Sequence, residues 1–241
     1  MVQNEVCRDA VTYHGQLARD WEQRYRKPSF RARLVVLDEC LDGRSLHGQW
    51  LDAGCGSGAL SRWLAERGCA VLGVDAAPEM VQVSCDLAAN HQDSERLSFR
   101  QVETIARLPI EAGRLDGILC SSVLEYLPDP AVCVAEFSRV LRPGGVLLVS
   151  VPNAASLVRR AQVVCHRVGK GLGRSWVKFL EYSHNQYQVL EFSELLIRAG
   201  FSVHGALAFG GPLPRGIQRR RWVGPLLMFL AEKNVNRSAS Q

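Results

Sequence analysis

Several features that mark membrane, secreted or metal-binding proteins are missing from this chain of 241 residues. No run of about 18 uncharged apolar residues occurs, so no membrane-spanning helix is predicted. The first residues are polar and mixed in charge, unlike a secretory signal. The eight cysteines form no Cys-x-x-Cys pair, so the sequence indicates neither a zinc site nor a disulfide framework. We therefore expect buried thiols, no metal and a cytoplasmic location.

The glycine-rich loop of the chain has no lysine at its end. It lies within residues 50–60, where an apolar run stops at Asp52 and glycines follow at alternate positions. A phosphate-binding loop would continue with Gly-Lys-Ser or Gly-Lys-Thr, and the Asp52 carboxylate would repel a pyrophosphate. The glycines still allow a sharp turn and let a ligand lie against the main chain. This pattern favours a ligand that carries ammonium and hydroxyl groups.

A second acid indicates that the ligand is a nucleoside. Asp75 ends the next apolar run, about twenty residues beyond the glycines, where an acid binds a ribose diol in a doubly wound sheet. These residues leave three interpretations open. The glycines could form only a tight strand–helix turn, or they could bind a nucleoside with a sulfonium group. They could also bind a nicotinamide dinucleotide, because Gly54, Gly56 and Ala59 satisfy its fingerprint.

Short apolar runs alternate with amphipathic segments between Gln49 and Pro152. This alternation predicts right-handed crossovers and a parallel sheet. Asp129 and Pro130 predict a helix start, with aspartate as the cap and proline in the first turn. We expect strands near residues 49–53, 70–75, 97–102, 115–121, 145–151, 201–207 and 226–231, and helices near 59–67, 78–91, 130–141 and 192–199.

The chain is predicted to contain one main domain preceded by helices. Residues 5–43 have a helical pattern that breaks near Pro28. The expected parts are an N-terminal helical cap over residues 1–45, an α/β domain over 46–233 with a basic helical insertion at about 153–190, and a disordered tail over 234–241.

Acidic residues are absent between Asn153 and Leu180, although the net charge of the whole chain is only +5. This segment carries six basic residues, and a second basic island follows later in the chain. An anionic partner should therefore meet the C-terminal half. The basic residues are Arg159, Arg160, Arg167, Lys170, Arg174 and Lys178, followed by Arg215, Arg219, Arg220 and Arg221.

Four motifs, in this order and at this spacing, resemble those of the class I S-adenosylmethionine-dependent methyltransferases. They are Leu51–Gly58, Val74-Asp75 with Pro78-Glu79-Met80 after it, Leu115–Leu127 and Leu141–Gly145. The resemblance covers roughly residues 49–152 strongly, and it displaces the nicotinamide interpretation, which has no use for the Arg-Pro-Gly-Gly turn. It implies an α/β fold: a doubly wound, mostly parallel seven-stranded sheet with helices on both faces and the last strand antiparallel.

Further features are similar to the ubiquinone-biosynthesis O-methyltransferases and related small-molecule enzymes. These are Gln101–Thr104, Leu124–Pro130 and a long segment after the fifth strand. The resemblance implies transfer of a methyl group from S-adenosylmethionine, leaving S-adenosylhomocysteine. It also implies a small-molecule acceptor, with a hydroxyl or phenol of a quinone precursor or natural product receiving the methyl group.

The resemblance also implies a set of cofactor-binding residues at the strand ends. The glycine loop would line the methionine portion, with an acid close to its ammonium. The acid after the second strand would accept hydrogen bonds from the ribose. Residues after the second and third strands would border the adenine, and an arginine before the first strand would bind the carboxylate. The set comprises Arg33, Asp52, Ala53, Gly54, Gly56, Asp75, Ala76, Met80, Glu103, Thr104 and Ser121, with Arg31 as an alternative to Arg33.

Aromatic and histidine residues supply candidates for a lid and a base. Tyr13, Trp21 and Tyr25 could cover a sulfonium through cation–π attraction, although core packing is the alternative. His184 lies where relatives line the acceptor pocket, so it is the candidate general base, with His14, Glu125 and Tyr126 as alternatives. A purely structural histidine is the competing interpretation.

Residues 154–168 predict an amphipathic helix with apolar residues on one side and arginines on the other. Three roles are open for it. The segment 154–178 could rest on an anionic membrane, making the protein membrane-peripheral, or it could cover the acceptor pocket. Alternatively, it could cap the sheet and leave a solvated basic face.

Two alternatives to small-molecule methylation fit parts of the sequence. The basic C-terminal half would suit an RNA or protein substrate. However, Cys120–Val123 replaces the Asn/Asp-Pro-Pro-aromatic motif common in enzymes that methylate base amino groups, so nucleic acid is not expected as a partner. The second alternative is a non-catalytic scaffold that binds the cofactor. The oligomeric state stays open.

Overall fold

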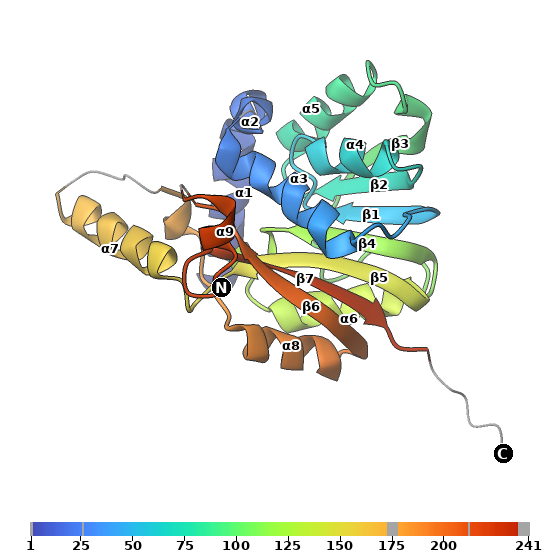
Figure 1. Cartoon of the computed structure of the whole chain (residues 1–241). Coiled ribbons are helices and arrows are strands. Elements are labelled where there is room, and N and C mark those ends of the chain that lie inside the picture. The colour runs from blue at the N-terminus through green and yellow to red at the C-terminus, as the bar shows by residue number, and fades with distance from the viewer. Residues whose placement is uncertain (1, 26, 173–177, 212, 236–241) are drawn as a thin grey trace.

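The computed structural model describes residues 2–25, 27–172, 178–211 and 213–235 (Figure 1). For residues 2–8, 29 and 178 it describes the backbone only. The chain begins with three helices, α1 (Val2–Gln16), α2 (Ala18–Arg24) and α3 (Pro28–Leu41). Proline needs no hydrogen-bond partner in a first helical turn, so the predicted break near Pro28 is where α3 begins. Residues 236–241 of the predicted tail lie outside the described residues.

Strands and helices then alternate as the sequence predicts. The first half contains β1 (Gln49–Ala53), α4 (Ala59–Ala65), β2 (Ala70–Asp75), α5 (Pro78–Ala88), η1 (Ser94–Arg96), β3 (Leu97–Gln101), β4 (Leu115–Ser121), η2 (Leu124–Tyr126), α6 (Pro130–Val140) and β5 (Leu141–Pro152). The second half contains α7 (Leu157–Gly171), η3 (Lys178–Glu181), α8 (Val189–Arg198), β6 (Phe201–Phe209), α9 (Arg215–Gln218) and β7 (Leu226–Lys233).

The strands form one seven-stranded sheet in the order β3-β2-β1-β4-β5-β7-β6. The first five pair in parallel, and β7 runs antiparallel to both β5 and β6. The predicted fold class is therefore confirmed. One detail differs, because β5 begins at Leu141 and not near residue 145. The register between β4 and β5 shifts there, which accommodates the Arg-Pro-Gly-Gly turn within the strand.

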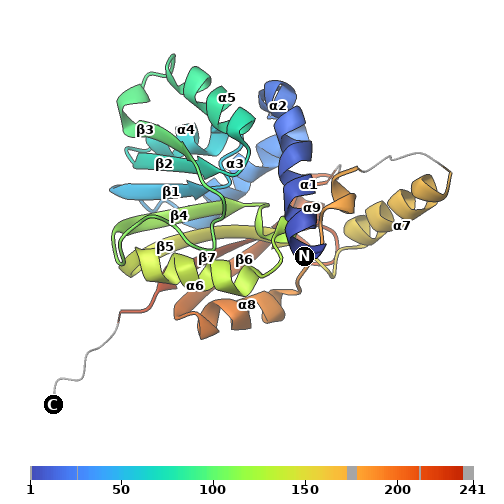
Figure 2. The ribbon, with the colours of Figure 1, turned by 180° about the vertical axis from the view of Figure 1, so that it is seen from behind.

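Both faces of the sheet are buried by helices. Side chains of a strand alternate between the two faces, so neighbouring residues enter different cores. Figure 1 shows α3 and α4 on one face, and Figure 2 shows α6 and α8 on the other. Trp50, Leu119 and Leu148 belong to the core with α3 and α4, whereas Leu51, Ile118 and Leu147 belong to the core with α6 and α8.

The chain order reverses between β1 and β4, where the crossovers leave in opposite directions. In open α/β sheets, ligands bind at this switch point beyond the carboxyl ends of the strands. In both views α1, α2 and α7 lie on the same side of the molecule, at one end of the strands, and α7 projects away from the body (Figures 1 and 2). Among the described residues, no helix is long and apolar enough to cross a membrane.

None of the cysteines with described side chains forms a disulfide. Most are buried or half-buried, as predicted, but Cys85 on α5 and Cys165 on α7 are exposed. Both lie on the outer side of an amphipathic helix, so the expectation of uniformly buried thiols is wrong at these two positions. The side chain of Cys7 lies outside the described residues.

Candidate functional site

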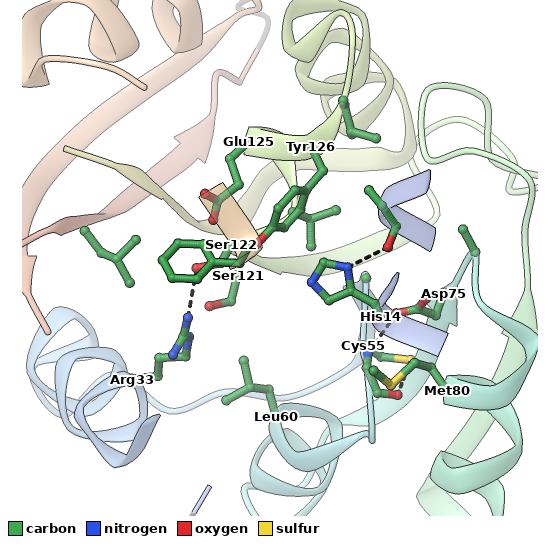
Figure 3. A pocket seen from close by; sticks show the side chains of 18 of the residues that line it. His14, Arg33, Cys55, Leu60, Asp75, Met80, Ser121, Ser122, Glu125 and Tyr126 are labelled. Atoms are coloured by element: carbon green, nitrogen blue, oxygen red, sulfur yellow. Dashed lines mark hydrogen bonds between the residues drawn. The ribbon is translucent and has the colours of Figure 1, made fainter. Parts of the chain in front are cut away.

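A large cavity opens beyond the carboxyl ends of β1, β2 and β4, with a volume of about 1190 Å³ (Figure 3). Cavities for one small ligand measure roughly 300–1,000 Å³, so this space can hold two ligands side by side. The glycine-loop side is lined by Gly54, Cys55, Gly56, Asp75, Ala76, Met80, Glu103, Thr104 and Ser121. The α7 side is lined by Arg159, Gln162, Phe179, Gly210, Gly211, Leu213, Gln218, Pro225 and Leu226.

The glycine loop needs its glycines for conformation and for space. Gly54 and Gly56 have φ values of 77° and 55°, in the left-handed region that L side chains rarely adopt. A Cβ at Gly54 would lie 2.2 Å from a methyl carbon of Val123, and one at Gly56 would lie 3.1 Å from the indole nitrogen of Trp21. The bare backbone therefore forms the cavity wall, with an aromatic side chain close above it.

Asp75 lies at the end of β2 with both carboxylate oxygens facing backbone amides. The N–H of Gly56 donates to Oδ2 and the N–H of Ala77 donates to Oδ1, each at 2.9 Å. Burial raises the pKa of Asp75, while these two hydrogen bonds oppose the rise. Ala76 and the buried Met80 line the cavity beside it. The sequence predicted this cluster.

Asp52 and Ala53 do not line the cavity, unlike the other predicted cofactor-binding residues. Both are buried in β1, and Asp52 accepts a hydrogen bond of 2.6 Å from the Ser61 hydroxyl. Burial raises the pKa of Asp52 to about 7. The Asp52 side chain therefore holds the first turn of α4 behind the glycine loop. We expected it to lie beside the ammonium group of a ligand, and the structure corrects this expectation.

Arg33 reaches the cavity from α3 and donates to the Ser122 hydroxyl at 3.1 Å (Figure 3). Its guanidinium lies over the ring of Phe30, and no carboxylate pairs with it in the parts of the chain that the structure describes. Ser122 has a φ of 58°, which is uncommon for a residue other than glycine and is typical of functional sites. The exposed Arg31 does not line the cavity, so Arg33 is the better placed of the two predicted candidates.

The remaining predicted residues lie at the rim and floor of the same side. Glu103 and Thr104 follow β3 and are exposed, and the Thr104 hydroxyl accepts from the amide of Ala106. Ser121 ends β4, with its hydroxyl 3.2 Å from that of Ser150 on β5. All three line the cavity. The Glu103 carboxylate is therefore free to reach a ligand edge from the solvent side.

Aromatic rings from α1, α2 and η2 cover the cavity. The ring of His14 contacts those of Tyr13, Trp21 and Tyr126 at centroid distances of 5.1, 5.3 and 4.9 Å. Tyr25 also lines the cavity. The Tyr13 ring stacks on Tyr182, with centroids 5.0 Å apart, so the start of the chain meets the segment after α7. The three predicted lid aromatics thus lie over the site.

His184, the base expected from the sequence, is not in the cavity. Its side chain is exposed, because the amides of His184 and Asn185 both donate to the carbonyl oxygen of Glu125 and hold this segment with the imidazole outward. The structure places His14 in the cavity instead, between Asp75 and Tyr126 (Figure 3). The expectation that His184 lies in the site is therefore corrected. Its alternative, His14, lines the cavity.

The α7 side contains residues from the polar side of the predicted amphipathic helix. Arg159 is buried, and its Nη2 lies 3.2 Å from Oε2 of Glu125 and 2.6 Å from the Ser183 hydroxyl. Burial raises the pKa of Glu125, with Arg159 and Ser183 opposing the rise. Two buried atoms that belong to cavity-lining residues, Nε of Arg159 and Oε1 of Gln162, have no hydrogen-bond partner among the residues that the structure describes. Helical periodicity places both residues on one side of α7 but does not show that this side faces inward.

These features fit a nucleoside ligand at the switch point of a doubly wound sheet. The bare glycine backbone, the Asp75 carboxylate and the apolar Met80 suit an amino-acid chain, a ribose and a base, in that order. The unpaired Arg33 suits a carboxylate. Among the described residues, no group of three or more histidine, cysteine or acidic side chains could hold a metal ion. The class is thus a nucleoside-binding α/β protein with a second ligand space.

Comparison with known proteins identifies the class more closely. A family model described as a methyltransferase domain matches residues 51–149. A ubiquinone biosynthesis O-methyltransferase of Marinobacter nauticus is 34% identical over 181 residues, which cover 71% of this chain and 70% of the relative. A protein of the same name from Coxiella burnetii is 32% identical over 155 residues, or 63% of this chain and 64% of the relative.

Comparison with solved structures shows a shared fold. A solved S-adenosylmethionine-dependent methyltransferase of Thermotoga maritima superposes with a TM-score of 0.67 at 16% sequence identity, over 93% of this chain and 100% of the other. The chain belongs to the class I S-adenosylmethionine-dependent methyltransferases, in the family of its ubiquinone-biosynthesis relatives. Its methyl donor is S-adenosylmethionine.

Proposed function

We propose that this methyltransferase transfers the methyl group to a hydroxyl of a small aromatic acceptor of the quinone-precursor or natural-product type. The observation that carries the proposal is a continuous cavity that joins the glycine-loop side to the α7 side. The names of the curated relatives support it, because they describe O-methylation in ubiquinone biosynthesis. The apolar walls on the α7 side of this cavity also favour a small molecule over RNA or protein.

The residues on the glycine-loop side are assigned to the donor. The backbone of Gly54 and Gly56 follows its methionine chain, and Arg33 binds its carboxylate as a charged donor. Asp75 accepts from the ribose hydroxyls, since it is already held as an acceptor between two amides. Ala76 and Met80 border the adenine, with Glu103 and Thr104 at its polar edge and Ser121 beside the methionine chain.

The α7 side is assigned to the acceptor. Phe179, Leu213, Pro225 and Leu226 supply apolar walls for a ring and its substituents. The unpartnered Nε of Arg159 and Oε1 of Gln162 would leave buried polar groups unsatisfied unless a ligand pairs with them. A ligand hydroxyl can accept a hydrogen bond from Nε of Arg159 and donate one to Oε1 of Gln162. This chemistry supports an acceptor that carries oxygen functions and argues against a plain hydrocarbon.

The protein residues mainly align the reactants and exclude water. The bound donor supplies a methyl group on a positively charged sulfur, which needs no further activation. The aromatic rings over the cavity keep water away and suit a cation. The walls of the two sides hold the acceptor oxygen in line with the methyl group, and such positioning accounts for a large part of the barrier reduction in two-reactant steps.

We further propose that α7 rests on an anionic membrane surface. Its outward stripe is apolar, with Leu157, Val164, Val168 and Leu172 each more than half exposed. Exposed basic residues flank this stripe, and Trp222 lies at its N-terminal end, where its carbonyl accepts from the amide of Leu157. Apolar and aromatic groups with flanking arginines are typical of interfacial helices. Leu213 is both exposed and cavity-lining, so the cavity reaches the outer surface on the α7 side.

Methylation assays with labelled donor test the proposed function. We expect the purified chain to methylate an alkylated catechol or a hydroxylated benzoquinol, with mass spectrometry locating the methyl group on oxygen. Bulk RNA and a protein extract serve as rival substrates in parallel reactions. Transfer only to RNA or protein would contradict the proposal, and binding of donor and product without any transfer would indicate a scaffold.

A further inference from the structure

The hydrogen bonding of His14 fixes which ring nitrogen is free. Its Nδ1 lies 2.7 Å from the carbonyl oxygen of Ala10, one helical turn earlier on α1. A carbonyl oxygen can only accept, so Nδ1 carries the hydrogen and the neutral ring has an unprotonated Nε2. Nothing in the described parts of the chain hydrogen-bonds to Nε2. A lone pair is therefore available to a ligand in the cavity.

The surroundings of His14 favour the neutral ring. Burial lowers the pKa of His14, and this effect outweighs the Ala10 carbonyl and the Asp75 carboxylate, which raise it. Arg24 on α2 acts with the burial. On the η2 side the ring meets Tyr126, whose own pKa is raised by burial, so that it is a neutral phenol at neutral pH. A neutral imidazole can take up a proton, whereas a charged one cannot.

The position of the ring is also suitable for a reacting group. Figure 3 shows His14 projecting into the cavity, with Asp75 on one side and Tyr126 and Glu125 on the other. Asp75 belongs to the glycine-loop side, and Glu125 touches Arg159 of the α7 side. The imidazole therefore lies where the donor space and the acceptor space meet.

We propose that His14 is the general base of the methyl transfer. The inference rests on the proposed function, namely methylation of a hydroxyl. The acceptor oxygen forms its bond to the methyl carbon as the carbon–sulfur bond of the donor breaks, and that electron pair stays on sulfur as a neutral thioether. The hydroxyl proton passes to Nε2 of His14, and the imidazolium later releases it to water. The Ala10 carbonyl and the Asp75 carboxylate stabilise the charged ring in the meantime.

Two acceptors that differ in acidity test this role. Catechol needs to lose a proton during the reaction, whereas the nitro group of 4-nitrocatechol makes one hydroxyl ionised beforehand. General-base removal costs about 10²- to 10⁴-fold in rate. We expect His14→Asn and His14→Gln to lose rate in this range with catechol and to change little with 4-nitrocatechol. Asparagine can still donate to the Ala10 carbonyl, which separates loss of the base from loss of that contact.

The matched control is His184→Gln, because His184 is exposed and lies outside the cavity. Titration calorimetry with S-adenosylhomocysteine checks that each variant folds and binds. Nitrogen-15 NMR of the unaltered protein gives a readout independent of turnover, and we expect the tautomer protonated at Nδ1. A neutral ring protonated at Nε2, or equal losses with both acceptors, would overturn the inference. Absence of any oxygen methylation by the unaltered chain would instead contradict the proposed function.

Discussion

The amide of Gly56 and the carboxylate of Asp75 are joined by a hydrogen bond of 2.9 Å, which ties the loop after β1 to the end of β2. The second carboxylate oxygen is held by the amide of Ala77. Gly56 and Asp75 are nineteen positions apart in the chain, so one acidic side chain fixes the ends of two strands relative to each other. The glycine loop is organised by the protein itself, so the acid both shapes the loop and lines the cavity.

Replacing Asp75 should weaken cofactor binding. Hydrogen bonds to a charged group contribute about 1.5–3 kcal/mol each, so the loss of one corresponds to roughly 10- to 150-fold in affinity. We expect Asp75→Asn to weaken S-adenosylhomocysteine binding within this range, measured by titration calorimetry. Asp86→Asn on the exposed side of α5 is the matched control. Unchanged affinity in the Asp75 variant would remove the proposed ribose contact.

Arg33 should be needed only for the amino-acid part of the donor. We expect Arg33→Met to weaken S-adenosylhomocysteine by about 10- to 150-fold, because one charged hydrogen-bonding partner is lost. Binding of 5′-methylthioadenosine, which has no carboxylate, should stay the same. Arg31→Met, two positions earlier and outside the cavity, should alter neither. Equal weakening of both ligands would mean that Arg33 supports the fold and does not bind the carboxylate.

Replacing Gln162 should weaken binding of the acceptor and leave binding of the donor unchanged. Gln162→Leu keeps the size of the side chain but removes the unpartnered Oε1. A neutral hydrogen bond is worth about 0.5–1.5 kcal/mol, so KM for a hydroxylated acceptor should rise roughly 2- to 12-fold. Affinity for S-adenosylhomocysteine is the internal check. Gln186→Leu, at an exposed position outside the cavity, provides the comparison, and the same KM in both variants would refute the contact.

The outward stripe of α7 should determine membrane binding. Burial of a valine contributes about 1.5–3 kcal/mol, so Val164→Asp should reduce sedimentation with phosphatidylglycerol vesicles roughly tenfold or more. Raised salt should weaken binding by the unaltered chain as well, because the flanking residues are basic. Leu190→Asp introduces the same charge at an exposed apolar position on α8 and should bind normally. Equal sedimentation of both variants would exclude α7 as the contact.

Asp52 should make the stability of the protein depend on pH. Its pKa is raised by burial from 3.8 to about 7, so the folded chain prefers the protonated acid. The stabilisation is complete below the unfolded pKa and is lost as the pH rises toward 7, by about 4 kcal/mol in total. Asp52→Asn has no acid to titrate at this position. As the pH rises toward 7, its free energy of unfolding, measured in urea titrations, should therefore increase relative to that of the unaltered chain. A constant difference between the two would contradict the raised pKa.

Local sequence was sufficient to predict the glycine-loop side. The strand ends, the glycines and Asp75 lie within a continuous βαβ segment, where spacing along the chain determines position in space. The family resemblance supplied Arg33 and Arg31 as alternatives, and only Arg33 lines the cavity.

The arrangement of the α7 side could not be predicted from local sequence. The orientation of His184 depends on a contact with the carbonyl of Glu125, almost sixty positions away in the chain. The side of α7 that faces inward is set by the Arg159–Glu125 pair, and the apolar stripe stays outside because the helix projects beyond the sheet. A hydrophobic pattern defines the apolar side of a helix but not what covers it, so the three roles of this segment stayed open.

The stack of Tyr13 on Tyr182 joins the aromatic cover of the cavity to the segment that follows η3. Tyr13 lines the cavity, whereas Tyr182 supports it from outside. Loss of the Tyr182 ring should therefore loosen α1 over the cavity, even though this ring touches neither reactant space.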